Sequence, residues 1–349
     1  MTSAQDRKLP GNYGSPAPAN TASGMEQGRL VLAPMEGVLD YAMRRLLTEI
    51  NRYDWCVSEF VRVSEVVLPE KVILKEAPEL SEGGVTAAGT PVWVQLLGSR
   101  PDTVAASALV AVKLGAPGID LNFGCPSRLV NRSLGGAAVL RTPDLVGDVA
   151  RAVRDMVPPE IPVSAKIRLG WADAAEAPEI IRNLDRAGVS LITIHARTRH
   201  DVYAPGTVKW EAVKPLRELT SIPMIINGDI IDPESCARAR ELSGLRDVMV
   251  GRQAVAVPNL ERVLRGNAKP FDVRASLEAC LRFAAILSRR TEEHFIKARI
   301  KQFLGYVRKA RPEIQDLFRE VCRNETLSGI LAVIEAGIRN QQESNQTGI

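Results

Sequence analysis

The feature that most constrains the fold of this chain is the regular alternation of short apolar segments with longer segments of helical periodicity. The apolar segments predict strands at 29–33, 56–60, 91–96, 118–122, 162–167, 191–194, 222–226 and 247–250. Such alternation is typical of a parallel sheet with helical crossovers. Roughly eight such units in about 240 residues favour a TIM (β/α)8 barrel over an open, doubly wound sheet.

Signals for helix starts lie between these segments. Asp40 is placed to cap a helix that reaches about Asn51, and Asp232 precedes a proline at another helix start. Thr142 is expected to be the N-cap of a third helix, with Pro143 at its first position and its end near Met156. Further helices are predicted at 101–114 and 179–187.

The two ends of the chain differ from the predicted barrel at 29–268. Residues 1–28 are rich in Pro, Gly, Ser, Ala and Asn and contain no sustained apolar run, so we expect a disordered leader without a signal peptide or a spanning helix. From about 271 to 338 the apolar residues recur at helical spacing, as at Ile296, Ile300 and Phe303. We therefore predict an α/β barrel followed by a C-terminal helical-bundle domain at 269–349.

Charge and cysteine content limit the partners that can be inferred. The formal net charge of +4 is too small to indicate a polyanionic partner by itself. The 5 cysteines are far apart and the chain has only 3 histidines, which argues against a metal site and against a disulfide framework. A reducing cytoplasm is the expected compartment, without membrane attachment.

The most informative single stretch is residues 118–127, GIDLNFGCPS. A short apolar strand ends at Asn122, and a glycine, Cys125 and a proline follow, so Cys125 is expected on a tight loop just past the strand. A lone cysteine is more often a small buried hydrophobe, but these neighbours favour a functional thiol. Barrel active sites lie at the carboxyl ends of the strands.

Polar residues lie at or just past the carboxyl ends of most of the other predicted strands as well. These residues are Glu36, Arg62, Gln95, Lys166, Arg168, His195, Asp229 and Arg252. Asn227-Gly228-Asp229 and Gly251-Arg252 follow the seventh and eighth strands, where many barrels bind phosphate with backbone N–H groups. Glycine at such a place also serves turn geometry, but the two motifs together favour a phosphate site, to which Arg252 could add a charged hydrogen bond.

In order along the chain, several motifs resemble those of the tRNA-dihydrouridine synthases. These motifs are Pro34-Met35-Glu36-Gly37, Gln95-Leu96-Leu97-Gly98, 120–126, Lys166-Ile167-Arg168, His195-Ala196-Arg197-Thr198, Asn227-Gly228-Asp229 and Gly251-Arg252. The resemblance covers about residues 29 to 265. It implies a flavin enzyme that uses FMN and NADPH to reduce the C5–C6 double bond of a uridine in tRNA.

The resemblance also implies roles for individual residues. Hydride would reach C6 of the uracil from reduced FMN, and Cys125 would give a proton to C5. Gln95, Lys166 and His195 would lie at the flavin, as would the backbone of Pro34, Met35 and Glu36. With the phosphate motifs, the predicted cofactor residues are Pro34, Met35, Glu36, Gln95, Lys166, His195, Asn227, Gly228, Asp229, Gly251 and Arg252.

Substrate contacts follow from the same resemblance. Asn122 and Tyr203 would face the flipped-out uridine. Arg62, the segment 169–171 and the tail 298–306 resemble the bacterial subfamily that acts at position 16 of the D-loop, and Arg132 and Leu134 depart from the family's usual glycine-rich run. The basic face of the tail predicts tRNA contacts at Arg299, Lys301, Tyr306 and Arg308 in a monomeric enzyme.

Two other functions stay open at this point. A flavin barrel that reduces a free pyrimidine, of the dihydroorotate or dihydropyrimidine dehydrogenase type, would explain the barrel and the phosphate site but not the basic tail. A tRNA-binding factor without catalysis would explain the tail but has no use for Cys125, Lys166 and His195 together. Binding that weakens steeply with salt would support either tRNA function and not the free pyrimidine.

Overall fold

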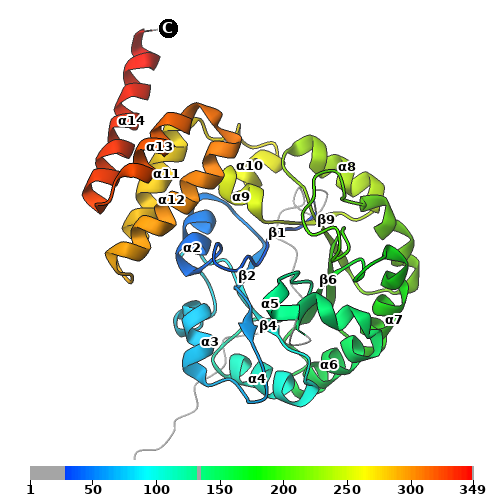
Figure 1. Ribbon diagram of the computed structural model, residues 1–349. Coiled ribbons are helices and arrows are strands. Elements are labelled where there is room, and N and C mark those ends of the chain that lie inside the picture. Colours follow the sequence, from blue (N-terminus) through cyan, green and yellow to red (C-terminus); the bar gives the residue numbers. More distant parts are fainter. Residues whose placement is uncertain (1–27, 132–134, 348–349) are drawn as a thin grey trace, which may run out of the picture.

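The computed structural model describes residues 28–131 and 135–347. All of the predicted leader 1–28 except its last residue lies outside the described residues, as do the departures at Arg132 and Leu134. Parallel strands form a closed barrel, seen along its axis in Figure 1. The eight strands are β1 (Leu30–Leu32), β2 (Trp55–Val57), β4 (Val92–Leu97), β5 (Ile119–Phe123), β6 (Val163–Arg168), β7 (Leu191–His195), β8 (Met224–Asn227) and β9 (Asp247–Val250). Pairing of β1 with β9 and of β2 with β4 closes the sheet, which confirms the predicted TIM barrel.

The second predicted strand is wrong at its carboxyl end. It stops at Val57, and a separate two-residue strand β3 (Val61–Arg62) pairs further along β4. The hydroxyl of Ser58 accepts the backbone N–H of Gln95 at 3.1 Å and donates to the carbonyl of Glu59 at 2.9 Å. A side chain therefore takes the place of a ladder carbonyl, and the strand breaks at 58–60.

The amino-terminal half of the barrel interior is apolar and closely packed. A separate buried cluster fills it, made of Val31, Ala33, Trp55, Val57, Trp93, Leu191, Ile225 and Met249. The rings of Trp55 and Trp93 stack with centroids 5.1 Å apart. A Cβ atom on Gly118 would lie 2.4 Å from the Trp93 ring, so glycine at this position makes room for the stacked pair.

Helices surround the barrel and bury their apolar faces against the outward-facing strand residues. They include α2 (Tyr41–Ile50), α3 (Glu70–Glu76), α4 (Pro101–Lys113), α6 (Pro143–Met156), α7 (Ala177–Ala187), α8 (Pro233–Ser243), α9 (Arg252–Ala256) and α10 (Leu260–Leu264). After β7 the crossover is a 3-10 helix, η4 (Trp210–Leu219), which contains Pro215. The predicted caps at Asp40 and Asp232 are confirmed by hydrogen bonds to backbone N–H groups. Thr142 occupies the N-cap of α6, but its side chain makes no cap bond, and Pro143 and the acidic Asp144 in the first turn favour that start.

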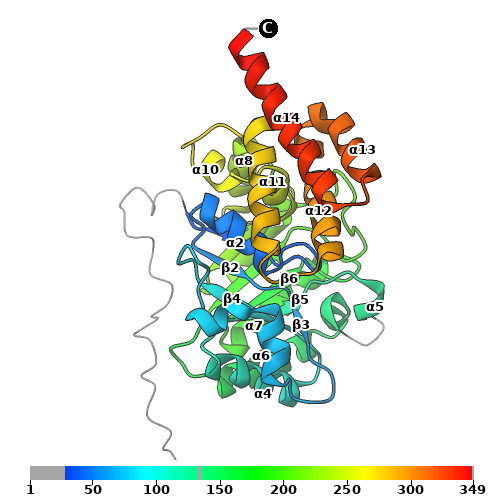
Figure 2. The same ribbon diagram turned by 90° about the vertical axis from the view of Figure 1, so that its left-hand side faces the viewer.

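The C-terminal part is helical, as predicted, and it packs on one side of the barrel. It contains α11 (Val273–Leu287), α12 (Glu293–Ala310), α13 (Gln315–Arg323) and α14 (Leu327–Thr347). Helices α11 and α12 lie against α2 and α9, and one apolar core runs through both parts. Helix α14 extends away from the body in both ribbon views (Figures 1 and 2).

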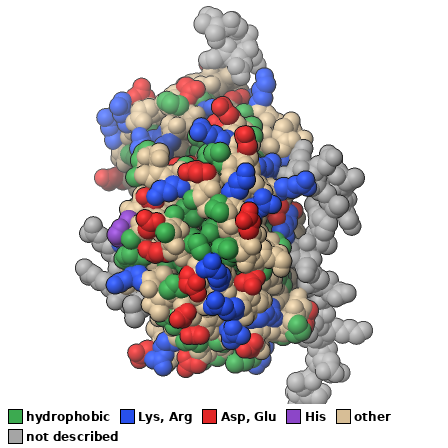
Figure 3. Space-filling model, turned by 90° about the vertical axis from the view of Figure 1, so that its right-hand side faces the viewer, with side chains coloured by type: hydrophobic (Ala, Val, Ile, Leu, Met, Phe, Trp, Pro, Cys, Tyr) green, Lys and Arg blue, Asp and Glu red, His purple; other side chains and the backbone are tan. Residues whose placement is uncertain are grey.

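Two surface properties bear on partners. Acidic and basic side chains are interspersed on the face over α7 and α8, as is typical of a solvated outer surface (Figure 3). Within 28–131 and 135–347, none of the helices combines the length and the apolar character that crossing a bilayer requires.

Candidate active site

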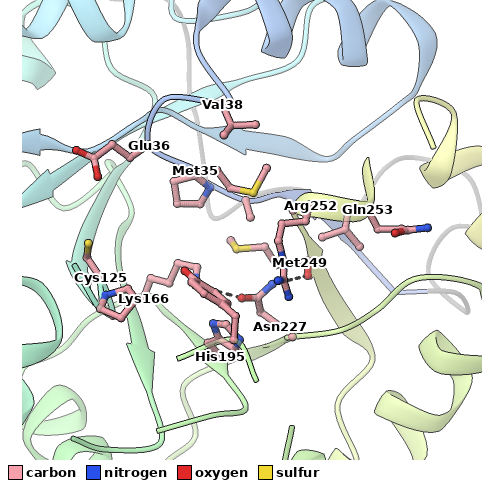
Figure 4. A pocket seen from close by; sticks show the side chains of 18 of the residues that line it. Met35, Glu36, Val38, Cys125, Lys166, His195, Asn227, Met249, Arg252 and Gln253 are labelled. Carbon is pink, nitrogen blue, oxygen red and sulfur yellow. Dashed lines mark hydrogen bonds between the residues drawn. The ribbon is translucent and has the colours of Figure 1, made fainter. Parts of the chain in front are cut away.

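A cavity of about 690 Å³ opens at the carboxyl ends of the barrel strands. All of the predicted cofactor residues line it, together with Asn122, Cys125, Tyr203 and Tyr306. Cys125 lies on one side of the cavity, and Arg252 and Gln253 lie on the opposite side (Figure 4). The fold therefore brings together side chains from seven of the eight strand ends, as the barrel prediction requires.

Cys125 lies on the loop directly after β5, partly exposed to the cavity. The side-chain oxygen of Asn122 accepts the backbone N–H groups of Gly124 at 3.0 Å and of Cys125 at 2.9 Å, which fixes this turn. Burial raises the pKa of the Cys125 thiol, with a further rise from the charge of Glu36. The thiol is therefore protonated at neutral pH and is suited to donate a proton.

Lys166 extends from β6 into the cavity and carries an ammonium group that is removed from water. Its Nζ atom donates to Oδ1 of Asn227 at 3.2 Å (Figure 4). Burial lowers the pKa of Lys166 to about 8, and the neighbouring charge of Arg168 acts in the same direction. Because a lysine ammonium has three donors and one is bonded to Asn227, the other two can serve a ligand in the cavity.

His195 ends β7 and is buried beside several cations. Burial lowers its pKa well below the ordinary value, and the charges of Arg168 and Lys166 lower it further. The imidazole is therefore neutral at physiological pH, with one donor and one acceptor nitrogen. A neutral ring can bond a polar ligand edge without adding charge to this crowded site.

The loops after β8 and β9 are joined by a shared carboxylate. Asp229 pairs with the buried guanidinium of Arg197 and, at 2.9 Å, with the half-exposed guanidinium of Arg252. Gly228 has φ +123°, and a Cβ atom there would lie 3.0 Å from the His195 ring. A side chain is thus excluded next to His195, and a ligand can approach this backbone closely.

These features match the needs of a flavin mononucleotide. The cavity volume falls within the range of cofactor sites. Lys166 offers a half-buried cation with further donors, which suits the negative charge of a reduced flavin ring. The glycine-containing strand ends at Gly228 and Gly251, with Arg252 beside them, suit the phosphate.

Tyr203 lines the cavity, and two guanidinium groups lie close to its ring. Arg168 is 5.1 Å and Arg252 is 4.8 Å from the centre of its ring. Arg168 is itself held by the carbonyl oxygens of Gly124, Thr198 and Val202. The aromatic ring is thus supported on a fixed cation and still 46% exposed, which suits stacking against a planar group.

The tail residues predicted to bind tRNA lie in different places. Tyr306 lines the cavity, whereas Arg299 bonds the carbonyls of Gly37 and Val38 and pairs with Asp40 at 3.0 Å. Lys301 bonds the carbonyls of Cys322 and Asn324, and Arg308 bonds Gln315 and covers the Phe318 ring. Arg62 is exposed at the end of β3, outside the cavity lining. The RNA contacts of these four charged residues stay predictions, and three of them hold the helical part together or to the barrel.

Sequence reasoning missed several residues of the site. Lys309 lines the cavity from α12, and its position three residues after Tyr306 could have revealed it, because residues i and i+3 share a helix face. Arg168 and Arg197 stood in the motifs but received no role. Val38, Phe60 and Gln253 reach the cavity from loops and helix starts and gave no local signal.

Solved structures have similar folds, and the likeness at this level of identity concerns the fold alone. Histamine dehydrogenase from Rhizobium sp. 4-9 matches with a TM-score of 0.52 and 15% identity over 74% of this chain and 49% of that one. A variant of NCR from Zymomonas mobilis matches with a TM-score of 0.50 and 16% identity, over 70% and 88% of the two chains.

Sequence relatives cover nearly the whole chain. A tRNA-dihydrouridine(16) synthase of Vibrio parahaemolyticus is 43% identical over 92% of this chain and 99% of its own length. The protein of that name in Shewanella oneidensis is 44% identical over 88% of this chain and 97% of its own. The sequence pattern of the family described as "Dihydrouridine synthase (Dus)" matches residues 31–346. The chain therefore belongs to the dihydrouridine synthase family of flavin-dependent oxidoreductases.

Proposed function

We propose that this protein reduces the C5–C6 double bond of a uridine in the D-loop of tRNA, at position 16, with FMN as cofactor and NADPH as reductant. The observation that carries the proposal is the placement of the Cys125 thiol and the Lys166 side chain in the same cavity at the carboxyl ends of the strands. Position 16 rests on the names of the relatives. The free-pyrimidine reductase and the non-catalytic binder are the alternatives to be tested.

The cavity residues divide the work between cofactor and substrate. When bound, reduced FMN supplies a hydride to C6 of the uracil. Cys125 then gives its proton to C5, so the thiol becomes a thiolate and the pyrimidine ring becomes saturated. Gln95, Lys166 and His195 would bond the cofactor ring, and the cavity residues Asn227, Gly228, Asp229, Gly251 and Arg252 would hold its phosphate.

The uridine must leave its stack to enter a cavity of this kind. Tyr203, on its two guanidinium groups, and Asn122 are positioned to receive the base. Tyr306 and Lys309 extend the mouth of the cavity onto α12, so the helical part 269–349 contributes to the RNA surface. We place a monomeric enzyme in the cytoplasm, where its five free thiols stay reduced.

An anaerobic spectroscopic experiment tests the proposal. The purified protein is reduced with NADPH, and the visible flavin spectrum is followed after addition of tRNA that lacks dihydrouridine. Reoxidation by this tRNA is expected, with mapping of the product to position 16. Free uracil and orotate are the controls, and reoxidation by either would favour the free-pyrimidine reductase. A protein that binds tRNA but holds no reducible flavin would support the binding factor.

A further inference from the structure

We propose that Asp120 is a positioning residue which sets the direction of a chain of hydrogen bonds that leads from the barrel interior to Cys125. Asp120 lies on β5 and is 1% exposed. Its Oδ2 atom accepts from Nε2 of Gln95 at 2.6 Å, and Oε1 of Gln95 accepts from Nδ2 of Asn122 at 2.8 Å. Oδ1 of Asn122 then accepts the backbone N–H of Cys125 at 2.9 Å.

The donor and acceptor direction of this series of hydrogen bonds is set at the end that contacts Cys125. The backbone N–H groups of Gly124 and Cys125 can only donate, so Asn122 must turn its oxygen toward them. Its amide nitrogen then faces Gln95, which must accept with its own oxygen. The amide nitrogen of Gln95 in turn faces residue 120, and the chain is consistent only if that residue accepts.

Asp120 meets this requirement at the lower end. An ionised carboxylate is an acceptor only, and its second oxygen accepts from the hydroxyl of Ser164. Burial raises the pKa of Asp120, and the hydrogen bonds from Gln95 and Ser164 oppose that rise, as does the nearby cation of Lys166. Two acceptors or two donors facing each other anywhere in this buried chain would leave polar groups unsatisfied.

The functional consequence is indirect and concerns the proton donor. Asp120 itself is buried below the cavity and is absent from its lining. It orients the amide groups of Gln95 and Asn122, and Asn122 in turn holds the backbone N–H of Cys125. The same orientation fixes the direction of the second N–H of the Gln95 amide. This role deepens the proposed function, because it assigns what holds the thiol in place, but its test does not need tRNA.

The test reverses the donors and acceptors along these hydrogen bonds by substitutions that keep the side-chain shape. In Asn122→Asp, one oxygen keeps the two backbone N–H groups, but the other needs a donor, so Gln95 must turn over and point its oxygen at Asp120. In the double variant Asn122→Asp with Asp120→Asn, residue 120 can donate to that oxygen and still accept from Ser164. The double variant carries the same number of carboxylates as the natural protein.

The readouts are the melting temperature and the rate of Cys125 alkylation, followed by mass spectrometry of the peptide. We expect Asn122→Asp to melt several degrees lower and to change the alkylation rate clearly. In the double variant, at least half of the change in melting temperature and half of the change in alkylation rate should be recovered. Asp120→Asn alone, in the natural protein, should not raise the melting temperature. Asn183→Asp, on the outer helix α7, is the matched control, and Asp120→Asn should give it no recovery.

Two results would overturn the proposal. One is strict additivity of the two substitutions, and the other is an Asn122→Asp variant with natural melting and alkylation. All variants keep side-chain shape, so loss of folding in Asn122→Asp with recovery in the double variant would still support the reversed chain. Failure of this test leaves the tRNA experiment above unaffected, since that experiment uses the natural protein only.

Discussion

The guanidinium group of Arg299 on α12 lies 2.7 Å from the carbonyl oxygen of Val38, which lines the cavity. The same group bonds the carbonyl of Gly37 at 2.8 Å, and Gln302 donates to that carbonyl at 2.9 Å. The C-terminal helices therefore hold the loop that follows β1. This is the loop whose residues Pro34 to Glu36 are assigned to the flavin.

Replacing Arg299 by alanine should weaken flavin binding. The substitution leaves two carbonyl oxygens and Asp40 without their cation, and we expect a loss of roughly 2 kcal/mol in the free energy of unfolding. Flavin dissociation constants and thermal melts measure the two effects. Arg308→Ala, on the same helix, is the control, because it removes contacts to Gln315 and Phe318 and should lower stability alone. Unchanged flavin affinity in Arg299→Ala would contradict the positioning of this loop.

Replacing Cys125 by alanine should separate the two halves of the reaction. Flavin reduction by NADPH is expected at the natural rate, because the thiol takes no part in it. Flavin reoxidation by tRNA should slow by about 10²-fold or more, the usual contribution of a general acid. Stopped-flow absorbance measures both steps. Cys322→Ala removes an exposed thiol elsewhere and should leave both rates unchanged, whereas rapid reoxidation in Cys125→Ala would exclude the thiol as the acid.

The charge of Lys166 should make flavin binding depend on pH. With a pKa lowered to about 8 in the flavin-free protein, the side chain is charged below pH 8 and neutral above it. We expect FMN affinity to fall by roughly tenfold or more between pH 7 and pH 9.5, as the ammonium loses its proton. Fluorescence titration of the flavin-free protein measures this. Lys166→Met should bind more weakly at pH 7 and show a flat profile, and a profile as steep as that of the natural protein would assign the titration to another group.

Glu59 should destabilise the protein near neutral pH. Burial raises the pKa of its carboxyl group to about 7, and the charge of Asp40 adds to the rise. The folded state then binds more protons than the unfolded state between pH 4.5 and 7, so this group's contribution to stability falls as the pH rises through that window. Glu59→Gln keeps an acceptor for the N–H of Val38, and it should be more stable by roughly 2 kcal/mol at pH 8 and equal at pH 4.5. Urea unfolding at pH 4.5 and at pH 8 measures this. The same difference in the free energy of unfolding between the variant and the natural protein at both pH values would contradict the prediction.

Sequence reasoning recovered the parts of the structure that depend on local pattern. The strands, the caps at Asp40 and Asp232, and the polar residues at strand ends follow from periodicity and from the rule that barrel sites lie at carboxyl ends. Once the barrel was predicted, Cys125 and Lys166 had to meet at one edge. This holds for residues that are far apart along the chain but share the same end of the sheet.

The parts that were missed depend on particular contacts between distant segments. The break after Val57 arises because the Ser58 hydroxyl meets Gln95 across the sheet, and the strand pattern alone gives no sign of it. Arg299 looks like one more cation on a basic helix, and only the packing of α12 beside the loop after β1 shows its partners. The predicted tRNA contact of Arg299 depends on its charge, which the sequence shows. The sequence does not show that the side chain is buried against the barrel.

The stacked rings of Trp55 and Trp93 have a kinetic consequence for the proposed reaction. They belong to the apolar cluster that fills the amino-terminal half of the barrel, so the cavity is approached from its other end. We expect a nicotinamide and a tRNA that both reach the flavin through that mouth to compete for one face of it. The reductant must leave before the RNA enters, so initial-rate plots against one substrate at several fixed levels of the other should be parallel lines, and excess NADPH should compete with tRNA.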